Sequence, residues 1–109
     1  MAIEDKLADK ARQRKSDQAL RFRERNMSHL SAEEHLNSTG EPIKQYRQIH
    51  LSTELFYSRY AFLQEGLVRL AEHELALDAI SRGCRYVTNL DYHTSEKSII
   101  IVGRGLIKK

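Results

Sequence analysis

The sequence predicts an α+β protein, in which a charged N-terminal helix precedes a β-α-β-β unit with one long amphipathic helix packed on a small sheet that contains antiparallel strands. Three observations predict this fold. Residues 3–26 contain no Gly or Pro and are rich in helix-forming residues, residues 53–82 carry apolar side chains at helical spacing, and residues 99–102 form a continuous β-branched run. With 109 residues the chain has room for one domain, which we divide into an arm at 1–38 and a core at 41–109.

The helix predicted over residues 3–26 has a narrow apolar face. Its stripe of Ile3, Leu7 and Ala11 stops where charged residues fall at positions 14, 15 and 17. We therefore expect this helix to be marginal in solution unless a partner or a second subunit covers its apolar side chains. The side chains in question are Ile3, Leu7, Leu20 and Phe22.

A short helix and a loop are expected to join the arm to the core. Ser31 and Glu34 fit a capping box, which predicts a helix over residues 32–36. Residues 37–42 are polar and contain both Gly40 and Pro42, so they are predicted to be a loop.

The core is predicted to begin with a strand at residues 43–51, followed by a helix capped by Ser52 or Thr53 and ended by Gly83. The apolar face of this helix is expected to be Phe56, Tyr60, Leu63, Leu67, Leu70 and Leu77, widened by Val68, Ala71, Leu75 and Ala79.

Two strands, 84–92 and 97–107, are predicted to form a hairpin across a short polar connection. Gly103 and Gly105 alternate to one face, which indicates a close approach of backbone or a bulge. Strict alternation also places Tyr86 and Tyr92 on one face, where exposed aromatic rings would stack bases and buried ones would pack under the long helix.

Self-association is predicted from the size of the core. A unit of about 70 residues buries only about 60% of its unfolded surface, and a three-stranded sheet leaves two edges. A sheet continued across a symmetry axis addresses both problems, so we expect a homo-oligomer, dimer or larger.

The net charge of +3 lies in the first quarter of the chain, because residues 1–25 hold eight basic and five acidic residues while the remainder holds ten of each. A basic arm on a neutral body favours nucleic acid or an acidic protein surface as partner. The candidate phosphate contacts are Arg12, Arg14, Lys15, Arg21, Arg23 and Arg25. The alternative is a solvated helix of mixed charge.

No catalytic motif is found, so we expect a protein that is not an enzyme and that carries no cofactor. The five histidines lack the tight pair spacing of a zinc site, and the single cysteine, Cys84, has no predicted base beside it. A small-ligand site between subunits remains an alternative, with His50, Tyr86, Asp91 and Arg104 as its candidate residues.

No apolar stretch approaches the roughly 20 residues that span a bilayer, and the N-terminus lacks the apolar centre of a secretory signal. We therefore expect no membrane contact and a cytoplasmic location, with which one cysteine is compatible.

Residues 76–92, an alanine-containing helix that runs into Gly83 and a short strand, together with the final strand around Gly103, Arg104 and Gly105, resemble the YbjQ-like family. The dodecins and the YhcN-like periplasmic proteins are similar at the same coarse level. The resemblance covers residues 76–107 and implies a β-α-β-β fold and assembly into rings, and the YbjQ-like family is described as binding heavy metals. No functional residue is carried over, because Arg104 stands where that family tends to have small residues.

These observations favour a self-associating assembly or adaptor module whose basic arm engages a partner. Nucleic-acid binding through the arm and a small-ligand site at a subunit interface are the two alternatives.

Overall fold

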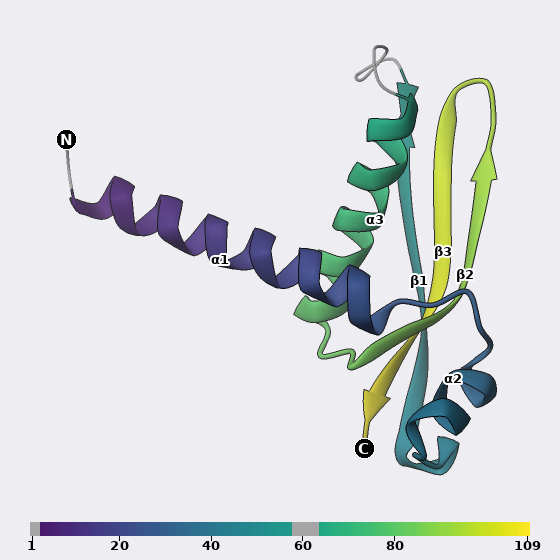
Figure 1. Cartoon of the computed structure of the whole chain (residues 1–109). Coiled ribbons are helices and arrows are strands. Elements are labelled where there is room, and N and C mark those ends of the chain that lie inside the picture. Colours follow the sequence, from purple (N-terminus) through teal and green to yellow (C-terminus); the bar gives the residue numbers. More distant parts are fainter. Residues whose placement is uncertain (1–2, 58–63) are drawn as a thin grey trace.

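The computed structural model describes residues 3–57 and 64–109, and it confirms the α+β class (Figure 1). Three antiparallel strands form a sheet in the order β1-β3-β2. The elements in chain order are α1 (Ile3–Asn26), α2 (Ala32–Thr39), the 3-10 turn η1 (Ile43–Gln45), β1 (Tyr46–Phe56), α3 (Gln64–Ser81), β2 (Tyr86–Thr94) and β3 (Ser98–Lys108).

The apolar run near the C-terminus lies in the central strand, β3, where Ile99 and Ile101 are almost fully buried. The helix α3 covers one face of the sheet with residues at helical spacing, namely Leu67, Ala71, Leu75, Ala76 and Ala79. Ile100 and Val102 point to the opposite face and are half-buried, so α3 covers only alternate residues of the run. The predicted hairpin of β2 and β3 is confirmed.

The predicted start of the long helix at Ser52 or Thr53 is wrong, because the strand β1 continues to Phe56. Residues 52–56 pair with Val102 through Ser98 of β3. Local sequence allows a helix here, but pairing with the most apolar strand of the chain stabilises the extended form. Phe56 is consequently half-exposed instead of facing the helix-covered core. The beginning of β1 also differs, since residues 43–45 form η1.

The sequence predicts Tyr60 and Leu63 on the apolar face of the long helix, and both lie outside the described residues.

The helix α2 begins where the capping box predicts, and the Ser31 hydroxyl accepts a hydrogen bond from the Glu34 backbone N–H at 3.2 Å. The helix runs to Thr39, so the loop predicted at residues 37–39 is wrong. Gly40 ends it in the left-handed conformation (φ 75°), and the Glu41 N–H bonds the Leu36 carbonyl.

Strict alternation along β2 fails at a bulge. The register with β3 shifts between Thr88 and Asp91, and Asn89 adopts a positive φ of 55°. The prediction that Tyr86 and Tyr92 share a face is therefore wrong. Tyr86 packs with the α2 cluster, and Tyr92 packs with the α3 cluster.

The C-terminal part of α1 packs on the core, whereas residues 9–18 are exposed all round. Ala19 and Phe22 are buried in the cluster that contains the α3 side chains, so the chain's own helix covers Phe22 without a second subunit. Leu20 is 46% exposed. Figure 1 shows the N-terminal part of α1 projecting away from the sheet and from α3.

Packing contacts cross the predicted division between arm and core. Leu36 of α2 packs with Tyr46 and Leu106 on the sheet face opposite α3, and Ala19 of α1 packs on the α3 side. Residues 19–36 therefore contribute to both sides of the sheet.

Candidate binding surfaces

The outer edge of β1 is open along most of its length. The Lys109 N–H bonds the Gln45 carbonyl and the Tyr57 N–H bonds the Lys97 carbonyl, at the two ends of the β1–β3 pairing. In an antiparallel pair the bonded residues alternate, so the odd-numbered residues of β1 bond β3 and the even-numbered ones point their N–H and C=O groups outward. The outward set is Gln48, His50, Ser52, Glu54 and Phe56, since the Tyr46 N–H is bonded to the Ile43 carbonyl. Among the described residues, no segment pairs with this edge.

The outer edge of β2 is partly covered, because the segment after α1 lies along it. Met27 bridges Val87 in parallel, and the Ser28 N–H bonds the Val87 carbonyl at 2.9 Å. The Asn89 N–H bonds the Leu30 carbonyl at 2.8 Å. Part of this edge is therefore closed to another strand.

The four residues of the predicted ligand site point to the sheet face opposite α3, but they do not converge. His50 and Arg104 are directly paired across β1 and β3, and Arg104 Nη1 donates to Gln48 Oε1 at 3.1 Å. A shallow hollow is lined by Gln48, Ile49, His50 and Arg104.

The other two predicted ligand residues have partners of their own. Asp91 lies opposite Val102, and its Oδ2 is 3.1 Å from His93 Nε2. The Tyr86 hydroxyl donates a hydrogen bond to Glu41 Oε1 at 2.9 Å. The structure therefore brings His50 and Arg104 together and leaves Asp91 and Tyr86 in separate pairs.

A polar cluster fastens α2 and the following turn to the sheet. The hydroxyls of Tyr46 and Tyr86 both donate to the Glu41 carboxylate, and Arg85 Nη1 lies 3.8 Å from it. The hydrogen bond from Tyr46 is the main cause that holds the pKa of Glu41 below its usual value. Burial, and then the bond to Glu41, raise the pKa of Tyr46 to about 12 and that of Tyr86 in the same direction.

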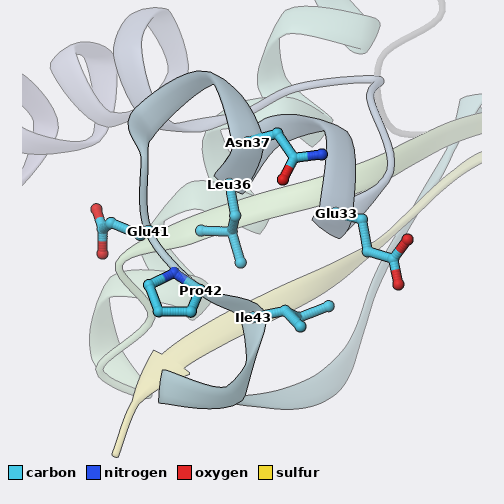
Figure 2. Close-up of a pocket in the computed structure, with 6 residues that line it drawn as sticks. All are labelled: Glu33, Leu36, Asn37, Glu41, Pro42 and Ile43. Carbon is cyan, nitrogen blue, oxygen red and sulfur yellow. The ribbon is translucent and has the colours of Figure 1, made fainter.

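This cluster stands beside a hollow between α2 and η1, and Figure 2 shows Leu36 inside it with the carboxylates of Glu33 and Glu41 pointing away from each other. The hollow is lined by Glu33, Leu36, Asn37, Glu41, Pro42 and Ile43. Neither carboxylate turns inward, and the bonds of Glu41 join α2 to two strands. We therefore assign the cluster a role in holding the fold.

A basic stripe runs along one side of α1. Lys10, Arg14, Gln18, Arg21 and Arg25 follow spacings of four, four, three and four, which places them on one face of a helix. Gln18, Arg21 and Arg25 also line one shallow hollow with Phe22 and Asn26. We call these five residues the basic stripe. Arg12 and Lys15 lie on another side of the helix, in line with Ala19 and Phe22.

Arg23 differs from the other candidate phosphate contacts. Its side chain is only 19% exposed, and its Nε lies 3.9 Å from Glu72 Oε2 on α3. The same Glu72 helps, after burial, to raise the pKa of Tyr92. Arg23 therefore belongs to the junction of α1, α3 and β2, and we leave it out of any proposed interface.

The remaining cysteine and histidine side chains of the described residues have structural contacts. Burial raises the pKa of the Cys84 thiol, which disfavours the nucleophilic thiolate. His29 stacks edge-on against Tyr92, and His35 against Tyr86. Within residues 3–57 and 64–109, no group of three or more His, Cys, Asp or Glu side chains is arranged to hold a metal ion.

None of the helices in the described part of the chain combines the length and the apolar character needed to cross a membrane.

The fold and these surfaces define an α+β protein with two candidate binding surfaces, the open β1 edge and the basic stripe. Comparison with protein-family models, with curated proteins and with solved structures finds no match. The resemblance of residues 76–107 to the YbjQ-like and dodecin-like families therefore stays a prediction.

Proposed function

We propose that this chain is a self-associating module, whose core pairs through the β1 edge and whose α1 helices face a partner. The open edge carries the proposal. Five residues from Gln48 to Phe56 direct unpaired backbone groups outward, and each backbone hydrogen bond made there adds roughly 0.5–1.5 kcal/mol. The exposed ring of Phe56 at the end of this edge supports the same conclusion.

Light scattering coupled to size-exclusion chromatography tests self-association at micromolar concentrations. We expect the wild type to be a dimer or larger, and Ser52→Pro to be a folded monomer, because the lost N–H points away from β3. Ser52→Ala is the matched control, since it keeps the N–H, and it should associate as the wild type does. A wild type that is a well-folded monomer would contradict the proposal.

Nucleic acid is the second candidate partner, and the arrangement of charge on α1 favours it. The basic stripe covers about 22 Å of helix length, and a duplex carries roughly one phosphate per 1.7 Å. Asp17 and Glu24 lie one turn before and one turn after Arg21, at one margin of the stripe, where its four basic residues outnumber them. A rod that projects from the core can lie along a phosphate backbone with little hindrance from the sheet.

A salt titration tests this second candidate. Affinity for a fluorescent DNA duplex and for single-stranded RNA is measured between 50 and 200 mM salt, where log affinity falls steeply if several phosphates are neutralised. The variant Arg14→Glu/Arg21→Glu should bind far more weakly and with a shallower slope. The control Arg12→Glu/Lys15→Glu has the same change of charge off the stripe and should lose less. Equal losses, or no binding at 50 mM salt, would exclude the stripe as the interface.

A further inference from the structure

We propose that β1 pairs with β1 of a second copy of this chain, antiparallel about a two-fold axis at Ser52, to form one continuous six-stranded sheet. This inference rests on the proposed function and adds the partner, the register and the size of the assembly. It follows from which backbone groups are free and from which side chains the pairing brings together.

The free backbone groups define the segment that pairs. The Tyr46 N–H is already bonded to the Ile43 carbonyl, so the outward-facing residues run from Gln48 to Phe56. Around a two-fold axis, an outward-facing residue can exchange hydrogen bonds only with another outward-facing residue. An axis at the midpoint, Ser52, is the arrangement in which all five outward-facing residues find a counterpart.

The side chains on the face opposite α3 favour the same register. It places His50 opposite Glu54 of the partner subunit, and the symmetry repeats this pair. His50 has Arg104 as its neighbour on β3, and Glu54 accepts a bond from the Ser98 hydroxyl at 3.4 Å. On each side of the axis, His50 and Arg104 of one copy thus lie in line with the Glu54 carboxylate of the other copy.

Neighbouring registers lack this complementarity. An axis at Leu51 would place His50 opposite Ser52 of the partner subunit and Glu54 opposite the partner's Gln48. An axis at Thr53 would place His50 opposite the partner's Phe56. Neither register places His50 opposite Glu54 of the partner subunit.

The face toward α3 also gains suitable pairs. Ile49 and Leu55 are half-buried at the margin of the core. With the axis at Ser52, Ile49 lies opposite the partner's Leu55, again twice. Apolar pairs directly opposite each other on a sheet contribute favourably, and these extend the covered core across the axis.

The assembly closes as a dimer. Pairing through β1 uses the open edge of both copies, and the edges that remain belong to β2. The segment from Met27 to Leu30 already lies along part of that edge. An isologous pair with its edges partly covered has no equivalent site for a third copy.

Charge reversal tests the register. In His50→Glu the introduced carboxylate would face Glu54 of the partner subunit, and in Glu54→Lys the introduced amine would face the partner's His50. We expect each variant alone to dimerise at least about tenfold more weakly than the wild type. In an equimolar mixture of the two variants, the introduced carboxylate faces the introduced amine at one pair and His50 faces Glu54, as in the wild type, at the other. The mixture should therefore form the mixed dimer in clear excess over both homodimers, as counted by native mass spectrometry. The double variant His50→Glu/Glu54→Lys should recover most of the wild-type affinity.

Cross-linking provides a second readout. Ser52→Cys places two introduced thiols opposite each other at the axis, so mild oxidation should give a disulfide-linked dimer. His50→Cys is the matched control and should cross-link poorly, because its counterpart is position 54. A wild type that is a monomer overturns the proposed function and this inference together. A wild-type dimer that neither prefers mixed pairs nor cross-links at position 52 overturns the register alone.

Discussion

Gly105 is the position at which one added methyl group should disturb the core most. A Cβ built there would lie 2.5 Å from the Cys84 sulfur and 3.1 Å from carbon atoms of both Ile49 and Leu51. Cys84 cannot easily withdraw, because its N–H bonds the Ala79 carbonyl at 2.9 Å just after the left-handed Gly83. The neighbours would have to give way by about 1 Å in a close-packed interior.

We therefore expect Gly105→Ala to lower the free energy of unfolding by about 2–3 kcal/mol. Urea unfolding followed by circular dichroism measures the change, provided that the slope with denaturant is unaltered. Dimerisation would add to the apparent stability, so the variant and the wild type are compared at the same protein concentration.

A double-mutant cycle tests the cause. Cys84→Ala removes the sulfur and alone should cost about 1 kcal/mol. In combination with Gly105→Ala it should return about 1–2 kcal/mol of the loss, because the worst contact is gone while those with Ile49 and Leu51 remain. Strictly additive effects, or a Gly105→Ala variant within about 0.5 kcal/mol of the wild type, would refute the packing argument.

Four further predictions concern α2, the Glu41–Tyr46 contact beside it and the buried thiol. Because folding lowers the pKa of Glu41, the contribution of this carboxylate to stability is complete at pH values above its usual pKa and is lost as the pH falls through the lower pKa of the folded protein. Glu41→Gln should therefore flatten the acid limb of a plot of unfolding free energy against pH. Because the pKa of Tyr46 is raised to about 12, its contribution is complete below about pH 10 and is lost as the pH rises toward 12, and ultraviolet titration should lose a late-ionising tyrosine in Tyr46→Phe. Leu36 is 1% exposed, so Leu36→Ala should cost about 2–5 kcal/mol in urea unfolding, and a cost below about 1 kcal/mol would mean that α2 is not part of the core. The Cys84 thiol should react with an aromatic disulfide reagent many times more slowly in the native protein than in urea, and equal rates would contradict its burial and raised pKa.

The sequence by itself determined the elements whose signals are local. Ser31 positions the start of α2 because a hydroxyl at that place can accept the N–H of Glu34, whatever else the chain does. Gly83 follows the end of α3 because glycine takes a positive φ without strain. The run Ile99–Val102 predicted a buried strand, and β3 is the strand paired on both sides.

The tertiary structure decided what depends on neighbours. Residues 52–56 have helix-compatible side chains, but pairing with β3 holds them extended and moves Phe56 to the surface. The bulge at Asn89 turns Tyr86 and Tyr92 to opposite faces. Strict alternation along a strand does not predict the extra residue of a bulge.

The candidate surfaces divide in the same way. The basic stripe follows from helical spacing, so the sequence could have shown it, although only packing against Glu72 removes Arg23 from the candidates. The open edge of β1 could not be foreseen, since it depends on which strand takes the centre of the sheet and on where the segment after α1 lies. Spacing along the chain fixes the face of a helix, whereas an edge exists only once strands from distant parts of the chain have paired.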